Sequence, residues 1–239
     1  GDWFRDYPYR GLANNSAVYD ERPDMNTFLK EWHSLYESKS GERGIFNRES
    51  ARNKVASVGR RDPDHVFGTN PCSEIILRPY QFCNLTEVVV KANDTIGSLT
   101  RKVELATQLG TYQSSLTDFK YLRKIWKQNT EEERLLGVSL TGILDNEMLS
   151  SNNCGLAGIL SGLKSVSIKA NDKLSKKMGI NASTSITCVK PSGTVSQLVD
   201  SASGIHPRHS AYYVRTVRGD NKDPLTQFMI QCGIPAEPA

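Results

Sequence analysis

The chain has 239 residues, of which 38% are hydrophobic, and its 30 basic and 26 acidic residues give a formal net charge of +4. This composition is typical of a soluble globular protein and argues against intrinsic disorder and collagen-like repeats. Because the basic residues are scattered and no apolar run approaches the ~20 residues that cross a bilayer, we expect neither a nucleic-acid-binding protein nor a membrane protein. The chain begins at Gly1 without an initiator Met or a signal segment, so we expect a piece of a longer protein.

The five cysteines are widely spaced, and no two of them form a C-x-x-C pair. They are Cys72, Cys83, Cys154, Cys188 and Cys232. This spacing argues against a disulfide-rich secreted domain and against a zinc site. It favours a reducing compartment, the cytoplasm, in which the first expectation for each cysteine is a small buried apolar side chain.

Two helices are predicted near the start of the chain. Apolar residues at helical spacing predict the first over residues 25–38, ended by Gly41 and facing a core: Met25, Phe28, Leu29, Trp32, Leu35 and Tyr36. Asn47 is placed to cap a second, mostly polar helix, which we expect to end near Gly59.

Extended segments come next, followed by a third helix. Residues 73–77 and 82–90 are short runs rich in β-branched side chains and are predicted to be strands. Residues 98–109 place Leu99, Val103, Ala106 and Leu109 on one helical face, which we expect Gly110 to close. Residues 112–162 have no clean apolar period and receive no assignment.

The last third of the chain alternates helix, strand and helix. A helix is predicted from Leu163 to Gly179, with Val166, Ala170, Leu174 and Met178 on one face. Residues 183–189 are predicted to be a strand, 190–193 a tight turn and 194–199 a helix. This alternation predicts an α/β fold, and the lack of linkers or repeats favours one domain, or part of one, over residues 1–239.

Three polar side chains define the first candidate site. In an extended segment, Asn70, Cys72 and Glu74 would project from the same side, with Cys83 eleven residues beyond Cys72. An amide can hold hydroxyl groups, a carboxylate can exchange a proton, and a thiol can act as a nucleophile or radical carrier. On the residues alone, an exposed turn with a buried cysteine remains an alternative.

The second candidate site is the turn from Lys190 to Ser196, between a predicted strand and a predicted helix. Backbone N–H groups and hydroxyls at such a turn suit a phosphate, although many turns of this kind only cap a helix. His206 and His209 do not predict a metal site, because Pro207 prevents a regular helix between them and no third ligand stands nearby. No metal is therefore expected.

Four segments together resemble the ribonucleotide reductases. Residues 70–75 (NPCSEI) and 82–88 (FCNLTEV) are similar to the active-site segment of that family. Residues 44–49 (GIFNRE) and 188–198 (CVKPSGTVSQL) are most similar to its adenosylcobalamin-dependent, class II branch. The resemblance covers nearly the whole chain.

The resemblance implies a role for each candidate residue. Cys72 stands at the position of the thiyl radical that abstracts the 3′-hydrogen of the substrate, Glu74 at that of the carboxylate that deprotonates the 3′-OH, and Asn70 at that of the amide that binds the ribose hydroxyls. Cys83 matches one of the two reducing cysteines, whose partner we expect upstream of Gly1. The substrate's phosphates are expected on one loop, formed by Pro191, Ser192, Gly193, Thr194 and Val195.

The resemblance also implies a fold, a cofactor and partners. We expect the C-terminal portion of a ten-stranded α/β barrel with a central finger loop, lacking the first half of the barrel and the C-terminal redox tail. The expected reaction converts ribonucleoside di- or triphosphates to 2′-deoxyribonucleotides, with adenosylcobalamin starting the radical and a thioredoxin-like reductant acting through the absent C-terminal cysteines. The isolated chain is expected to have no turnover.

Other interpretations of the sequence remain open. A reductase whose radical comes from a separate metal-containing subunit would share the Asn-x-Cys-x-Glu pattern. A catalytically silent nucleotide-binding remnant would keep the phosphate turn without the thiol chemistry. A basic accessory domain would instead bind polyanions with a steep dependence on salt.

Overall fold

The computed structural model describes residues 3–9, 16–39, 44–150 and 155–238, which form two compact units over residues 1–207 and 208–239. Gly41 and Cys154 lie outside the described residues. Helices and strands alternate along the first unit, which confirms the predicted α/β class. No helix in the described part of the chain is both long enough and apolar enough to span a membrane.

Capping residues fix the ends of the first two long helices. They are α1 (Trp3–Asp6), β1 (Ser16–Tyr19), α2 (Met25–Ser38), β2 (Gly44–Asn47) and α3 (Arg48–Val58), with β1 and β2 parallel. At the start of α2, the Asp24 carboxylate accepts hydrogen bonds from two backbone N–H groups. At the start of α3, Asn47 accepts from the backbone N–H of Ser50, and the helix ends at Gly59 with φ 67°. Residues 25–38 are helical as predicted, but Lys39 (φ 49°) caps this helix rather than Gly41, whereas the second helix ends at Gly59 as expected.

The prediction that α2 faces a core is wrong for the part of the chain that the structure describes. Its apolar side chains are largely exposed: Met25 67%, Leu29 51%, Trp32 58% and Tyr36 77%. The buried residues of this helix are Glu31 and Ser34. Apolar periodicity identifies a face suited to burial, but it does not supply the element that would cover that face.

A parallel sheet forms the centre of the first unit. Strands β5 (Asn84–Val89) and β6 (Leu136–Thr141) pair over their whole lengths. Residues 184–188 run beside β6, where Val138 N donates to Ile186 O (2.8 Å) and Val138 O accepts from Cys188 N (3.1 Å). The predicted strand over 82–90 is thus confirmed apart from its ends, whereas 183–189 forms only an isolated bridge, between Val138 and Thr187.

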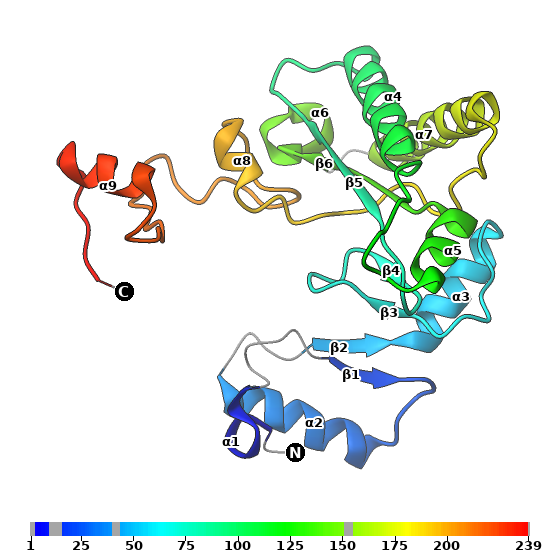
Figure 1. Ribbon diagram of the computed structural model, residues 1–239, viewed down its shortest axis with the longest axis horizontal. Helices are drawn as coiled ribbons and strands as arrows, with labels where there is room; N and C mark the ends of the chain where they lie inside the picture. The colour runs from blue at the N-terminus through cyan, green and yellow to red at the C-terminus, as the bar shows by residue number, and fades with distance from the viewer. Residues whose placement is uncertain (1–2, 10–15, 40–43, 151–154, 239) are drawn as a thin grey trace. The chain divides into compact units, whose positions relative to one another are not determined.

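Helices α4 (Ile96–Gln113) and α7 (Leu156–Met178) pack against each other, and α4 covers one face of this sheet (Figure 1). Apolar side chains from both layers fill the space between them: Val88, Val90, Leu99, Val103, Ala106, Leu136, Val138, Leu149, Leu163 and Ile186. This core leaves the opposite face of the sheet available for a site.

Helices α4 and α7 differ from the predictions in their bounds and in their buried faces, and α7 begins at Leu156 rather than Leu163. Helix α4 continues through Gly110 to Gln113, because Gly110 is a close-packing position: an added Cβ would lie 3.4 Å from Leu136. Leu109, predicted on the buried face, is 65% exposed. In α7 the buried positions are Leu163, Ser167, Asn171 and Ser175, one residue beyond the predicted apolar face, and Gly179 ends the helix as expected. Small and polar side chains here allow the two helices to approach closely.

The remaining elements are short. The unassigned middle of the chain contains α5 (Lys124–Glu133), β6, the 3₁₀ turn η2 (Ile143–Asp145) and α6 (Glu147–Ser150). After the sheet come α8 (Val195–Leu198) and, in the second unit, α9 (Pro224–Gln231), which the Asp223 side chain caps.

The face of the sheet opposite the α4 core is tightly packed around Gly137. A Cβ at this position would overlap Leu85 Cδ2 and lie 3.0 Å from Ile75 Cδ1 and 3.1 Å from Cys188 Sγ. We expect Gly137→Ala to destabilise the protein by about 1–3 kcal/mol. In the control, Gly162→Ala, the Cβ meets no atom within 4 Å on α7 and should stabilise by about 1 kcal/mol. Thermal unfolding measures both, and equal shifts of the two variants would contradict this packing.

Candidate active site

The first candidate site is built on a β-hairpin. Strands β3 (Gly68–Thr69) and β4 (Ile76–Leu77) are antiparallel, with Thr69 opposite Ile76. Residues 70–73 form a turn in which Ser73 N donates to Asn70 O (3.0 Å), with Pro71 at the second position, where its fixed φ suits the turn. The turn places Cys72 at the exposed tip of the hairpin.

The expectation of an extended segment over residues 70–74 is wrong. Ser73 has φ 62°, in the left-handed region, so the chain reverses and strict alternation of side chains is lost. Asn70 stabilises the reversal, because its Oδ1 accepts from Ile75 N (3.1 Å) and its own N donates to Ile75 O (3.2 Å). Asn70, Cys72 and Glu74 therefore lie on one tight turn rather than along one strand.

Glu74 lies close to two thiols that come from different strands. Cys83 directly precedes β5, and Cys188 lies on the segment beside β6. Burial, followed by the charges of Cys188 and Glu74, raises the pKa of Cys83 to about 12. Burial and the charge of Glu74 likewise raise the pKa of Cys188 to about 11, against the opposing charge of Lys190. Glu74 Oε2 is buried without a hydrogen-bond partner among the described residues.

Cys188 lies on the face of the sheet toward which Gly137 points. An added Cβ at Gly137 would meet Leu85, Ile75 and Cys188, whereas the neighbouring Leu136 packs in the core beneath α4. Cys188 was expected to be an ordinary buried thiol. Instead it is half-buried beside Cys83 and Glu74, and only its pairing with β6 reveals this position.

Glu87 is a second carboxylate near this group that the sequence did not single out. Burial raises its pKa, against the charge of Lys190 and a hydrogen bond from Thr141. Its Oε1 is buried and has no partner in the part of the chain that the structure describes. Two incompletely paired carboxylates and two protonated thiols give this region the capacity to exchange protons and to supply electrons.

The second candidate site begins two residues after Cys188. Lys190 N donates to Ser139 Oγ (3.0 Å), which joins the turn to the open face of the sheet. Gly193 has φ 54°, and Thr194 precedes the four-residue helix α8 without making a side-chain cap bond. Ser192 is buried, with its Oγ 3.0 Å from Ser203 Oγ. The predicted turn over 190–193 is shifted, because the turn bond runs from Val195 N to Ser192 O (3.2 Å). A phosphate-binding role for Pro191 to Val195 stays a prediction.

Two cavities adjoin these residues. One of about 310 Å³ is lined by Glu74 together with Arg61, Ile75 and Thr187. Another of about 460 Å³ is lined mainly by core and helix side chains such as Val103 and Leu163, with Cys188 at its wall. Both are at the lower end of the size range of small-molecule sites. Among the described residues, no group of three or more His, Cys, Asp or Glu side chains is arranged to hold a metal ion.

The chain is similar in sequence to several bacterial enzymes. It is 30% identical over 97% of its length to the adenosylcobalamin-dependent ribonucleoside-triphosphate reductase of Lactobacillus acidophilus. It is also 30% identical to the protein of that name from Lacticaseibacillus paracasei over 97% of its length, and 29% identical to the one from Lactobacillus leichmannii over 96%. No protein-family profile matches the chain.

The comparison of folds agrees with the comparison of sequences. A crystal structure of a B12-dependent, class II ribonucleotide reductase superposes on 96% of the chain with a TM-score of 0.69 and 25% identity. The chain is a homologue of class II ribonucleotide reductases. It spans about a third of the length of these reductases, 34% of each curated relative named above and 36% of the crystallised chain.

The contrast between exposed and half-buried thiols in this reductase homologue predicts selective alkylation. The thiolate is the reactive form, and the pKa values of about 12 and 11 keep Cys83 and Cys188 protonated at pH 8. We expect iodoacetamide to modify the exposed Cys72 well before these two, as measured by mass spectrometry of peptides after timed alkylation. The exposed Cys232 is the fast-reacting control, and equal rates at all four positions would contradict the structure.

The raised pKa values of Cys83 and Cys188 also predict how the free energy of unfolding changes with pH in alkaline solution. Both thiols have folded pKa values above their ordinary value of 9.0, so between these values the native state binds more protons than the unfolded state. The free energy of unfolding should therefore fall as pH rises above about 9. Replacing both cysteines with Ser should reduce that slope.

Proposed function

We propose that this chain is part of the catalytic barrel of an enzyme that reduces ribonucleotides to 2′-deoxyribonucleotides by thiyl-radical chemistry. The observation that carries the proposal is the hairpin turn that exposes Cys72 between Asn70 and Glu74, in a chain similar to the triphosphate reductases over 97% of its length. The proposed barrel has ten strands, with the β3–β4 hairpin as its central finger loop.

The proposed roles follow from the chemistry of each group. A thiyl radical on Cys72 takes the 3′-hydrogen atom of the ribose, while Glu74 accepts the proton of the 3′-OH. Replacing the 2′-OH by hydrogen then needs two electrons and two protons, one proton to release the hydroxyl as water and one that ends on C2′, and two thiols supply all four by forming a disulfide. Cys83 is the proposed first thiol, and its proposed partner lies in the upstream part of the enzyme. Asn70 is proposed to bind the ribose hydroxyls through its amide.

The phosphates of the substrate are proposed to bind at Pro191, Ser192, Gly193, Thr194 and Val195. In support, the turn begins beside Ser139 on the open face of the sheet, and the backbone N–H groups of Gly193 and Thr194 make no backbone hydrogen bond among the described residues. The names of the relatives favour a triphosphate as substrate.

Adenosylcobalamin is the proposed cofactor of the complete enzyme, since the relatives are named for it. A corrin ring does not fit within either cavity of this chain, with volumes of about 310 and 460 Å³. Residues outside these two cavities would therefore have to hold it. When bound, the cofactor would supply the radical that starts the reaction.

The remaining partners are also proposals. A thioredoxin-like protein is proposed to renew the reducing thiols through cysteines outside this chain, and the cytoplasm is the proposed compartment because it keeps such thiols reduced. The names of the relatives disfavour a separate metal-containing radical subunit.

The decisive experiment uses the complete protein, obtained from its full coding sequence. We expect reduction of CTP, with CDP as the comparison substrate, only when adenosylcobalamin and a dithiol are both present. Turnover without the cofactor would overturn the proposed radical source. Tight nucleotide binding with no turnover under any condition would instead favour a silent nucleotide-binding protein.

A further inference from the structure

A buried ion pair between Arg61 and Glu133 connects the Cys72 hairpin to the central sheet. Arg61 Nε donates to Glu133 Oε1 (2.7 Å) and Arg61 Nη2 donates to Glu133 Oε2 (2.8 Å), and both side chains are only 4% exposed. Two parallel hydrogen bonds fix the orientation of the guanidinium as well as its position.

At the base of the hairpin, Arg61 contacts β4 and the residue that precedes β3. Its Nη1 donates to the backbone oxygen of Ile76 in β4 (2.8 Å). Its guanidinium carbon lies 4.6 Å from the ring centre of Phe67, which is fully buried and directly precedes β3. A change at Arg61 therefore affects both strands of the hairpin.

Glu133 connects Arg61 to the segments beside the central sheet. It is the last residue of α5, and its backbone oxygen accepts from Thr184 N (3.0 Å), at the start of the segment that leads to Cys188. Two residues later, Leu135 O accepts from Asn84 N (2.9 Å), next to Cys83. Glu133 thus lies where the segments that carry both half-buried thiols begin.

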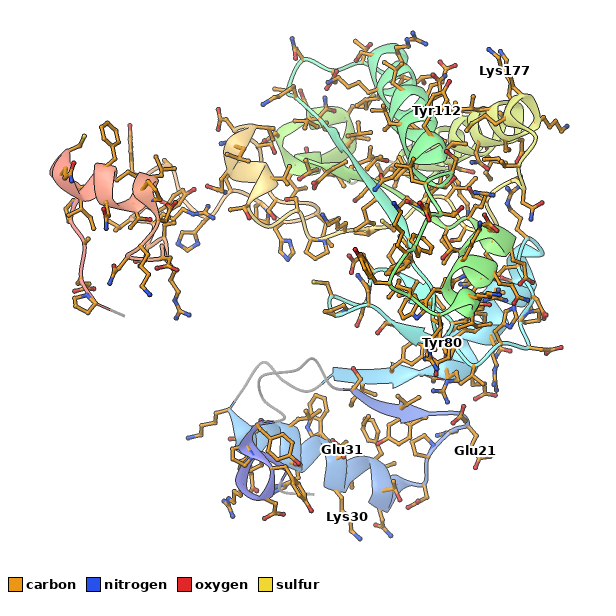
Figure 2. The ribbon with its side chains drawn as sticks, in the orientation of Figure 1. Glu21, Lys30, Glu31, Tyr80, Tyr112 and Lys177 are labelled. Atoms are coloured by element: carbon orange, nitrogen blue, oxygen red, sulfur yellow. The ribbon has the colours of Figure 1, made fainter. Side chains whose placement is uncertain are left out.

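Gln81 and Arg78 complete the hydrogen bonding of the pair. Gln81 Oε1 accepts from Arg61 Nη2 (3.0 Å) and from Arg78 N (3.1 Å), and Gln81 Nε2 donates to Glu133. Burial alone would raise the pKa of Glu133, but the hydrogen bonds from Arg61 and Gln81 and the nearby cations hold this pKa below its ordinary value. The carboxylate is therefore charged at neutral pH. The segment that carries Arg78 and Gln81 lies beside α5, as the labelled Tyr80 in the same segment shows (Figure 2).

Hydrogen bonds join the tip of the hairpin to its base. Both backbone and side-chain hydrogen bonds join Asn70 to Ile75, and the turn bond from Ser73 N to Asn70 O closes the loop between them. Cys72 lies only four residues from Ile76, which Arg61 contacts directly. A shift at the base would therefore move the Cys72 sulfur, and a misplacement of about 1 Å can cost ~100-fold in rate.

We propose that Arg61 and Glu133 are positioning residues, which set the place of Cys72 relative to Glu74 and Cys83 without touching the substrate. This inference rests on the proposed function for its catalytic consequence. The position of the hairpin itself does not depend on that function.

The kinetic test uses the complete enzyme and two conservative variants, Arg61→Lys and Glu133→Gln. Lysine keeps the charge but cannot donate to Glu133 twice and to Ile76 and Gln81 at the same time. We expect kcat to fall about 10- to 100-fold in both variants, with the KM for the nucleotide unchanged. The control is Leu163→Ala, which loses stability in the core beside α4 but leaves the hairpin contacts intact.

A second measurement reports the position of the hairpin without turnover. Nitroxide labels on Cys72 and on Arg101→Cys, an exposed position on α4, give a distance distribution by pulsed electron paramagnetic resonance after the other exposed cysteines are replaced. We expect a narrow distribution in the parent protein and in Leu163→Ala, and a broader or shifted one in Glu133→Gln and Arg61→Lys. Should Glu133→Gln fail to fold, Arg61→Lys provides the same test.

The outcomes separate this inference from the proposed function. An unchanged distance distribution in the folded variants overturns the positioning role, as does a loss of kcat no larger than that of Leu163→Ala at a comparable loss of thermal stability. If the parent enzyme shows no turnover with any nucleotide, the proposed function fails and the catalytic consequence fails with it. The distances between the labels then still show whether the ion pair determines the position of the hairpin.

Discussion

Replacing Cys72 with Ser in the complete enzyme is expected to lower nucleotide reduction by at least about 1,000-fold, with little change in nucleotide binding. A hydroxyl group does not readily carry the radical that a thiol carries, and no other thiol lies on the hairpin tip between Asn70 and Glu74. Initial rates of deoxynucleotide formation measure turnover, and equilibrium binding of the nucleotide measures affinity. Because Cys72 is exposed in a turn, the substitution should leave the thermal unfolding temperature unchanged.

The control for this prediction is Cys232→Ser. Cys232 is also an exposed free thiol, but it belongs to the unit over residues 208–239 and the proposed mechanism does not use it. We expect this variant to retain full turnover. Equal activity of the Cys72→Ser variant and the parent enzyme would refute the radical role, whereas equal losses in both variants would indicate a general sensitivity to thiol loss.

Features that depend on neighbouring residues were predictable from the sequence. The Asn47 cap and the glycines that end helices, Gly59 and Gly179, act within one turn of their helices, and each lies where it was expected. Gly110 shows the limit of such signals. A glycine that ends a helix and a glycine that admits a neighbouring side chain look alike in a sequence, and only the packing of Leu136 distinguishes them.

The candidate site shows the same limit more strongly. Its residue types and the presence of a turn before α8 were predictable from the sequence, but that turn lies at residues 192–195 rather than 190–193, and the reversal at Ser73 replaced the expected extended segment. The position of Cys188 depends on pairing with a strand about fifty residues earlier in the chain. The partnership of Arg61 with Glu133 spans 72 residues and has no local signature. Contacts of this kind arise from tertiary structure, so neither spacing nor periodicity predicts them.

The second large effect concerns stability and compares two adjacent glutamates. We expect Glu133→Ala to destabilise the protein by about 3–5 kcal/mol, because the change leaves the buried Arg61 guanidinium without its counter-charge. Glu132→Ala should cost less, about 1 kcal/mol, since Glu132 is 56% exposed and its buried partner Arg78 keeps Asn129 and the nearby Glu133. Urea unfolding at pH 7 measures both values. Similar losses for the two variants would contradict the buried pair.

The pH dependence of stability in a further variant, Glu133→Gln, provides an independent check of the charge on Glu133. The folded pKa of Glu133 lies below its unfolded value, so in the interval between them the unfolded state binds more protons and stability rises with pH. The contribution of the pair is therefore fully present above the ordinary pKa of a glutamate and is lost as pH falls through the lower, folded value. Glu133→Gln lacks this titration, so the difference in unfolding free energy between it and the parent protein should narrow in acid. A difference that stays constant with falling pH would show that the Glu133 carboxylate is not held in its charged form by Arg61.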